Sequence, residues 1–132
     1  MNALSPTSAL QIRMWDPAIK RMWYRQEVVF QTLHLIHSDP ELAKVNKHRI
    51  FMLASNSFDS QNQGVFEGDI LEGWAGSDEF VRFQVLIRDH KFVTVDHDGV
   101  QFDLSDTDMS RFTIIGNVLQ HPEKALVPVE AV

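Results

Sequence analysis

The alternation of apolar and polar residues indicates that most of this chain forms β-strands. "QIRMWD" alternates and ends in an Asp-Pro turn at Asp16 and Pro17, after which residues 20–36 resume a β-rich run. The clearest strand is "EFVRFQVLIR", which places Val81, Phe83 and Val85 on one side. Further apolar runs predict strands at "HRIFMLAS", "VFEGDILEGW" and "RFTIIGNVL".

Turn and cap residues divide these runs. Asp98-Gly99 lies between "KFVTV" and "VQFDL" and predicts a hairpin. "SDPELAKVNK" differs, because Ser38 or Asp39 can cap a helix whose first position suits Pro40, so a short helix is predicted over about 40–47. Residues 1–10 read as a frayed lead-in. We predict a single β-dominated domain over 11–132, a small closed barrel or roll with one or two short helices.

Composition and charge narrow the classes of function. The 132 residues include no cysteine, which excludes disulfides and thiolate chemistry. The net charge of −6 is uneven, since residues 1–54 hold seven Lys/Arg against four Asp/Glu and residues 55–132 hold five against fourteen. An acidic majority argues against nucleic-acid binding by the whole surface. No secretory or membrane segment is visible, so we expect a soluble cytoplasmic protein.

Three ordered segments resemble the YopX family of phage and prophage proteins. They are "IRMWD" with "KRMWY", "DSQNQGVFEGDIL", and "IIGNVLQHPEKA". The chain departs from the family at Asn62 and near Asn56, where a glycine is usual. The resemblance implies an SH3-like barrel as the core and a phage or prophage origin, with the cytoplasm of a bacterial host cell as the expected location, and it implies no reaction. The matching positions, which we expect to be structural, are Trp15, Asp16, Glu67, Gly68, Asp69, Gly116 and Asn117.

The segment "GVFEGDIL" brings two carboxylates together and permits two interpretations. On a strand, Glu67 and Asp69 point to one face and could share a metal or a proton. Gly68 between them instead suggests a turn or bulge in which the acids accept backbone hydrogen bonds. No third ligand stands at motif spacing. The turn is the favoured interpretation.

Candidate catalytic and metal residues are sparse. His34 and His37 lie in a segment predicted to be extended, where residues three apart face opposite ways, so a zinc site with His48 as third ligand is disfavoured. "DHDG" lacks the downstream ligands of a calcium loop. Neither a nucleophile elbow nor a phosphate-binding glycine loop is present. We therefore predict a protein that is not an enzyme and needs neither metal nor cofactor.

Two stretches could bind a partner. Acidic residues of the C-terminal part could meet a basic surface on a host protein, and the residues concerned are Asp96, Asp98, Asp103, Asp106 and Asp108. The leading hypothesis is a non-enzymatic phage-derived protein that inhibits a nucleic-acid-handling or defence complex of the CRISPR type. The alternative is a nucleic-acid-binding module that uses a basic and aromatic stretch, namely Arg13, Lys20, Arg21, Trp23 and Arg25. Trp15 is expected in the core, and the oligomeric state is left open.

Overall fold

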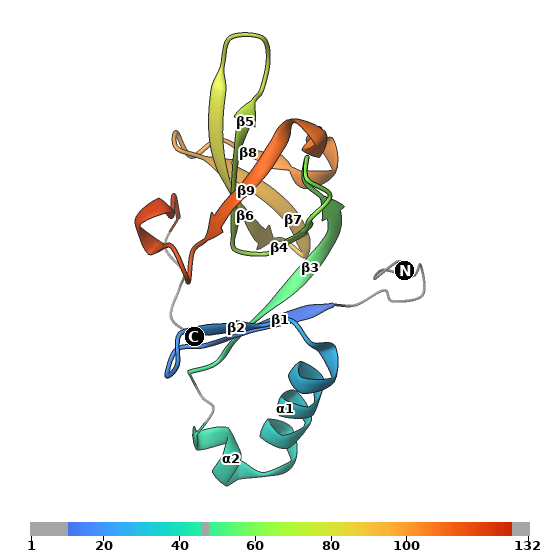
Figure 1. Cartoon of the computed structure of the whole chain (residues 1–132), viewed down its shortest axis with the longest axis vertical. Coiled ribbons are helices and arrows are strands. Elements are labelled where there is room, and N and C mark those ends of the chain that lie inside the picture. Colours follow the sequence, from blue (N-terminus) through green and yellow to red (C-terminus); the bar gives the residue numbers. More distant parts are fainter. Residues whose placement is uncertain (1–10, 46–47, 128–132) are drawn as a thin grey trace. The chain divides into compact units, whose positions relative to one another are not determined.

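The fold is that of a computed structural model, which describes residues 11–45 and 48–127 (Figure 1). The chain divides into two compact units, residues 1–54 and 55–132. We describe each unit separately. Because one domain can contain two compact units, the single domain over 11–132 stays a prediction.

The first unit holds a hairpin, a third strand and two helices. β1 (Ile12–Asp16) pairs antiparallel with β2 (Arg21–Trp23) and with the start of β3 (Ile50–Phe58). The predicted Asp-Pro turn joins β1 to β2, and the side chain of Asp16 accepts a hydrogen bond from the backbone N–H of Ala18. The helices are α1 (Gln26–Ser38) and α2 (Pro40–Val45). The short helix predicted over 40–47 is thus confirmed over 40–45, and residues 46–47 lie outside the described residues.

The β-rich run predicted over residues 20–36 is wrong beyond Trp23. Only three of its residues form a strand, and α1 begins at Gln26. Val28, Val29 and Phe30 read locally as a strand because β-branched and aromatic residues favour one. Val29 and Leu33, however, are four apart and pack against Ile12 and Met14 of β1, which rewards the helical period. Tertiary packing therefore outweighs local preference.

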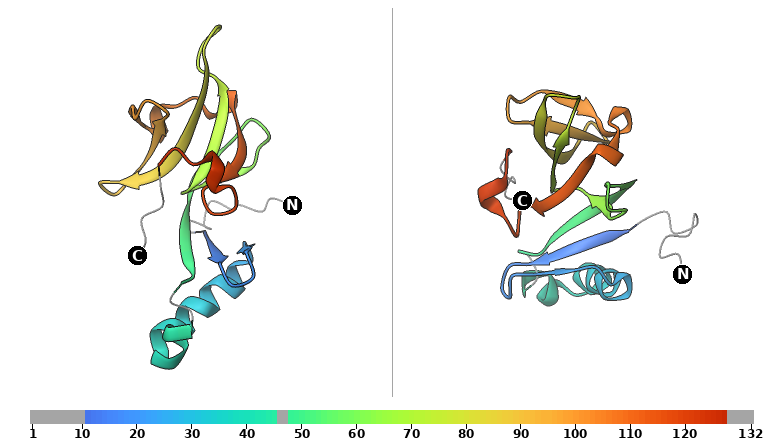
Figure 2. Two further views of the ribbon diagram at one scale, coloured as in Figure 1. Left: turned by 90° about the vertical axis from the view of Figure 1, so that its left-hand side faces the viewer. Right: turned by 45° about the horizontal axis from the view of Figure 1, so that its top comes forward.

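The second unit is built of antiparallel strands. Its five-stranded sheet has the order β8-β7-β6-β5-β9, formed by β5 (Asp69–Trp74), β6 (Phe80–Arg88), β7 (Lys91–Asp96), β8 (Gln101–Asp103) and β9 (Phe112–Asn117). β4 (Gly64–Phe66) neighbours the end of β3. The single-turn helices are η1 (Leu104–Asp106), η2 (Met109–Arg111) and η3 (Pro122–Lys124). The β5–β6 hairpin extends beyond the neighbouring strands (Figures 1 and 2).

One core cluster of the second unit lies on one face of this sheet. Leu71, Phe83, Val85 and Phe112 are buried there, and the rings of Phe83 and Phe112 meet edge to face with centroids 4.8 Å apart. The predicted side of β6 that carries Phe83 and Val85 is therefore the core side. The mainly β prediction is confirmed, whereas an SH3-like barrel stays a prediction. In the described part of the chain no helix is both long and apolar enough to cross a membrane.

Two asparagines adopt a backbone conformation that usually favours glycine. Asn56 and Asn62 adopt left-handed backbone conformations, with φ of 64° and 61°. Among non-glycine residues, asparagine enters this region most readily. Asn62 therefore keeps, without glycine, a backbone conformation that glycine favours, and Asn56 adopts the same conformation.

Candidate functional site

The second unit has a groove on the core face of its sheet, with a volume of about 450 Å³. Its floor is apolar and includes Val81 and Phe83 of β6 and Phe112 of β9. Val100, just before β8, and Phe102 within it also line the groove and remain exposed, with 45% and 59% of their surface accessible. Ala75 and Glu79 from the β5–β6 hairpin and residues 106–108 complete the walls. The groove combines exposed apolar surface with charged residues.

Strand register brings these side chains together. Phe83 stands opposite Asp96, and Thr94 stands opposite Phe102, so all four point to the same face. The turn between β7 and β8 is held by Asp96, whose Oδ1 accepts hydrogen bonds from the backbone N–H groups of Asp98 and Val100 at 2.9 and 3.0 Å. The Asp-Gly hairpin predicted here is confirmed, and it directs Val100 into the groove.

Carboxylates outnumber cations along the groove. Its acidic residues are Glu79, Asp96, Asp106 and Asp108. Arg111 is its one basic lining residue among those described, and its Nε lies 3.5 Å from Oδ2 of Asp108. Its Nη1 also donates to the carbonyl of Trp74. The Asp106 carboxylate has no hydrogen bond or ion pair with the described residues, so the groove retains an uncompensated negative charge.

Asp108 is held in its ionised form by its neighbours. Its Oδ1 accepts a hydrogen bond of 2.6 Å from the Ser110 hydroxyl and a weaker one from the Ser110 backbone N–H. The hydroxyl contact is the largest cause that lowers the pKa of Asp108 below its ordinary value of 3.8, and Arg111 adds to it. Because the pKa of Asp108 is lower in the folded state, its ionised form stabilises the fold. This stabilisation is complete above the pKa of the unfolded state and is lost as the pH falls through the pKa of the folded state.

Removing the Ser110 hydroxyl tests this assignment. We expect Ser110→Ala to raise the pKa of Asp108 towards 3.8, because the carboxylate loses its strongest hydrogen bond. The measurement is an NMR titration of the side-chain carboxyl carbons of wild type and variant under the same conditions. An unchanged Asp108 titration would show that the hydroxyl does not stabilise the carboxylate.

Three of the five acids predicted to bind a partner meet at the groove. These are Asp96, Asp106 and Asp108. Asp103 instead lines a smaller cavity of about 260 Å³ and forms an ion pair of 3.0 Å with Lys91. Asp98 lies at the exposed hairpin, with its Oδ2 3.4 Å from Nε2 of His97. The predicted acidic tract is therefore divided between separate surfaces.

Sequence reasoning missed the apolar part of the groove. Val100 and Phe102 stand in a short segment in which apolar and polar residues alternate, so a signal existed. Their exposure could not be read from the sequence, because alternation predicts which residues share a face and does not say whether that face is covered.

The "GVFEGDIL" segment forms the turn that was favoured above. β4 ends at Phe66 and β5 begins at Asp69, while Gly68 between them has φ of 90°. The Asp69 carboxylate is 2% exposed and accepts a 2.8 Å hydrogen bond from the backbone N–H of Phe66. Glu67 is only half-buried. The two acids therefore occupy different environments, and Asp69 stabilises the turn.

The other residues expected to be structural are buried, paired or placed in turns. Trp15 is buried in β1, and Asp16 forms an ion pair of 3.1 Å with Arg49. Asn117 accepts hydrogen bonds from the two backbone N–H groups that follow at residues 119 and 120. Gly116 lies against His121, because a Cβ at this position would stand 2.5 Å from the imidazole Nδ1.

The histidines do not lie as predicted. His34 and His37 fall on α1 rather than on a strand, so their spacing of three places them on neighbouring parts of one helix face. The Nδ1 of His37 contacts the Leu33 carbonyl at 2.8 Å. His48 follows α2, and no group of three or more His, Asp or Glu suited to a metal ion occurs among the described residues.

The basic and aromatic residues separate into one buried and four accessible positions. Arg13 is 2% exposed, and its Nε contacts the Met52 sulfur at 3.4 Å, so it is not available to a ligand. Lys20, Arg21 and Arg25 are exposed, and Trp23 is half-buried. The first unit therefore presents a smaller basic surface than the sequence indicated.

The family of the chain follows from comparison with known proteins. The family model described as "YopX protein" matches residues 11–125. The chain belongs to the YopX family. The chain is also similar to a solved structure, protein EF1440 from Enterococcus faecalis, at 16% sequence identity and a TM-score of 0.53, over 86% of this chain and 96% of that one. At this identity the likeness concerns the fold alone. Comparison with curated proteins found no match.

Proposed function

We propose that this member of the YopX family is a non-enzymatic interaction protein that binds a host protein through the groove. The observation that carries the proposal is an apolar floor bordered by four carboxylates and one partnered arginine. The complementary ligand is a protein segment with a Lys or Arg beside a large apolar side chain. The apolar side chain would cover Phe102 and Val100, and the cation would approach Asp106.

Charge and apolar contact act together in such a site. An apolar side chain that fills the groove excludes water, and the lower effective dielectric constant strengthens the attraction between the cation and Asp106. Charge complementarity also suppresses unsuited partners and accelerates association. Phe102, with 59% of its surface exposed, is the largest apolar area available at the groove.

The class of target follows from the same complementarity. Proteins that handle nucleic acids present Lys and Arg to neutralise phosphates, so an acidic groove can compete for those residues. We therefore propose a nucleic-acid-handling or defence complex of the host, such as a CRISPR-type complex, as the target, and inhibition as the result. The phage association of the YopX family supports this choice.

Affinity capture from a bacterial host lysate tests the proposal. The bait is compared as wild type, as Asp106→Lys and as the matched control Asp78→Lys, which changes an exposed acid outside the groove lining. We expect a protein that wild type and Asp78→Lys recover equally and that Asp106→Lys loses about tenfold or more, since reversing one interfacial charge changes the affinity by at least that factor. The purified partner must then bind in isolation, with weaker binding at higher salt.

Two outcomes would overturn the proposal. One is a partner that Asp106→Lys and Phe102→Ser both recover as well as wild type does, which would place binding elsewhere. The other is the absence of any partner above background in lysates of several hosts. Melting curves of both variants must match wild type, so that loss of binding is not loss of fold.

A further inference from the structure

The turn between β1 and β2 in the first unit combines an exposed apolar side chain with an unpaired cation. Ile19 is 59% exposed, and the next residue, Lys20, is also exposed. Lys20 forms no ion pair with any acidic residue in the described part of the chain. An apolar side chain next to a free cation is the chemistry that complements the groove of the second unit.

This combination is rare among the described residues. Tyr24 is also exposed beside an arginine, but that arginine, Arg25, already pairs with Glu27 at 2.7 Å. The other large apolar side chains that are exposed have neither Lys nor Arg next to them in the sequence. Ile19 and Lys20 are therefore the described segment that best matches the ligand proposed for the groove.

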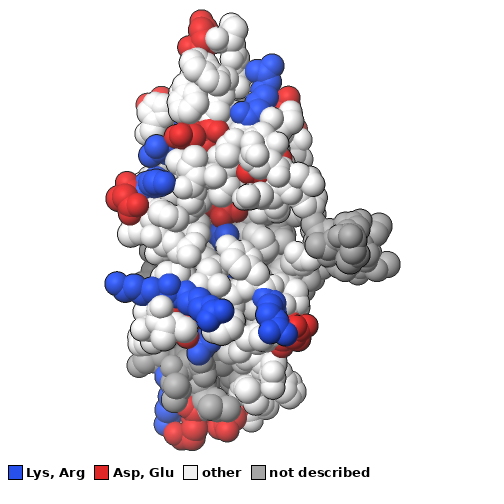
Figure 3. Space-filling view, viewed as in Figure 1, with Lys and Arg blue, Asp and Glu red and all other residues white. Residues whose placement is uncertain are grey.

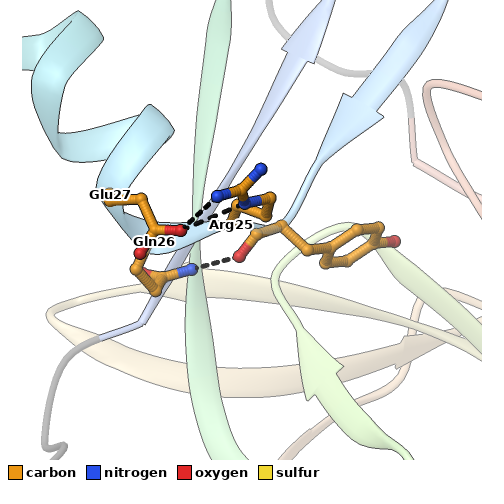
Figure 4. Close-up of polar contacts among 4 residues, drawn as sticks. Arg25, Gln26 and Glu27 are labelled. Carbon is orange, nitrogen blue, oxygen red and sulfur yellow. Dashed lines mark hydrogen bonds and ion pairs between the residues drawn. The ribbon is translucent and has the colours of Figure 1, made fainter.

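Hydrogen bonds order both ends of the β1–β2 hairpin. At the turn, Oδ1 of Asp16 accepts from the backbone N–H of Ala18 at 3.1 Å. At the open end, the side chain of Gln26 bonds the N–H and the carbonyl of Ile12 at 2.9 and 2.8 Å. Figure 4 shows Gln26 at the start of α1, where its amide also donates to the carbonyl of Tyr24. An ordered turn loses less conformational entropy when it binds.

The two units carry opposite net charges. The seven Lys/Arg and four Asp/Glu of residues 1–54 leave three positive charges, and the five and fourteen of residues 55–132 leave nine negative ones. Figure 3 shows Lys and Arg side chains gathered over the strands of the first unit. Opposite charges favour the approach of the first unit of one copy to the second unit of another.

We infer that the β1–β2 turn of one copy of the chain occupies the groove of a second copy. Ile19 would cover Phe102 and Val100, and Lys20 would approach Asp106. The groove, at about 450 Å³, has room for a branched side chain of this size. The contact joins two different surfaces, so it is heterologous and can continue from copy to copy. The inference rests on the proposed function, because it uses the same groove and the same ligand chemistry.

Self-association of this kind regulates access to the groove. A groove that holds the turn of another copy is closed to a host protein, so the two ligands compete. One apolar side chain and one cation make a small interface, and small interfaces are weak and transient. A larger host surface therefore displaces the second copy. Without the host protein, the second copy covers the exposed Phe102, which limits unspecific apolar association.

Analytical ultracentrifugation of the purified full chain tests the inference. The mean mass is measured from micromolar to millimolar protein at about 0.1 M and about 1 M salt, between which the Debye length falls from about 10 to about 3 Å. We expect the mass to rise with protein concentration, and to rise less at the higher salt because the attraction between Lys20 and Asp106 is screened. A monomer mass at every concentration in the lower salt would overturn the inference.

Two variants each disable one surface. The turn variant carries Ile19→Ser and Lys20→Asn, and asparagine suits the left-handed backbone of Lys20, with φ of 52°. The groove variant is Asp106→Lys. Each variant alone should associate about tenfold or more weakly than wild type. Lys44→Asn on α2 and Asp78→Lys outside the groove lining change exposed charges elsewhere and should associate like wild type.

Mixing the two variants is the decisive measurement. The groove variant keeps an intact turn and the turn variant keeps an intact groove, so the mixture should form a one-to-one pair although neither variant associates alone. The pair cannot grow, because its remaining turn and groove are both disabled. Contacts between two like surfaces would not be restored by mixing. A mixture that stays monomeric, from variants whose melting curves match wild type, would overturn the inference, as would a turn variant that associates like wild type.

Capture of the host protein separates failure of this inference from failure of the proposed function. The turn variant has an intact groove, so it should recover the host protein at least as well as wild type does. Such recovery combined with a monomeric wild type would overturn self-association alone. Recovery at the wild-type level by both Asp106→Lys and Phe102→Ser would instead overturn the proposed function, whatever the mass of the wild-type chain.

Discussion

Asp59→Ala is expected to lower the free energy of unfolding of the second unit by about 3–5 kcal/mol. The Asp59 carboxylate is 6% exposed and serves three backbone donors. Oδ1 accepts from the N–H groups of Gln61 and Gln63 at 2.9 and 2.8 Å, and Oδ2 accepts from the N–H of Ile114 in β9 at 3.0 Å. Alanine would leave all three donors unpaired. The measurement is urea denaturation followed by tryptophan fluorescence and circular dichroism.

Two further variants make this expectation specific. Asp59→Asn keeps one acceptor oxygen, which can retain the two bonds of Oδ1, but its amide would face the N–H of Ile114. We therefore expect Asp59→Asn to lower the free energy of unfolding by less than Asp59→Ala does. Asp78→Ala, at an exposed position of the same unit, should change stability by less than about 0.5 kcal/mol. A loss below about 1 kcal/mol for Asp59→Ala would mean that water replaces the carboxylate without cost.

Gly68→Val is expected to destabilise the second unit by about 2–4 kcal/mol, because a β-branched residue is strained at φ of 90°. The backbone cannot relax easily, since the N–H of Gly68 donates to the carbonyl of Val85 and its carbonyl accepts from the N–H of Val118, both within 3.0 Å. Denaturation with urea and the temperature of thermal unfolding would both report the loss.

Neighbouring substitutions separate backbone strain from chemistry. Gly68→Asn should cost less than valine, because asparagine enters the left-handed region more readily, as it does at Asn56 and Asn62. Glu67→Gln should leave stability and partner capture close to wild type, since the half-buried side chain keeps its size and one acceptor oxygen. If Glu67→Gln abolished partner capture with an unchanged melting temperature, the assignment of this segment to a turn alone would be wrong.

The sequence pattern predicted correctly those elements that depend on neighbouring residues. The alternation of β6, the Asp-Gly hairpin before β8 and the capped helix after Asp39 all appear close to their predicted places. The "GVFEGDIL" turn was also predictable, because Gly68 permits a backbone conformation that its neighbours disfavour. Each of these features depends on a few adjacent residues and on the geometry of the backbone.

The remaining features depended on contacts between distant residues. α1 replaces the predicted strand because Val29 and Leu33 are rewarded by packing on β1. Arg13 is buried although it stands in a basic stretch. The five acids separated because strand register placed Asp96 on the face of Phe102 and the single-turn helix η1 brought Asp106 to the same groove. Asp103 instead pairs with Lys91.

The sequence by itself therefore determined the β character of the chain, its turns and its uneven charge. These follow from residue type and spacing of two to four residues. Tertiary structure alone decided which apolar faces are covered, which charges are partnered and which carboxylates share a groove. The physical reason is that burial and pairing depend on atoms brought together across the sheet, from segments whose separation along the chain carries no local signal.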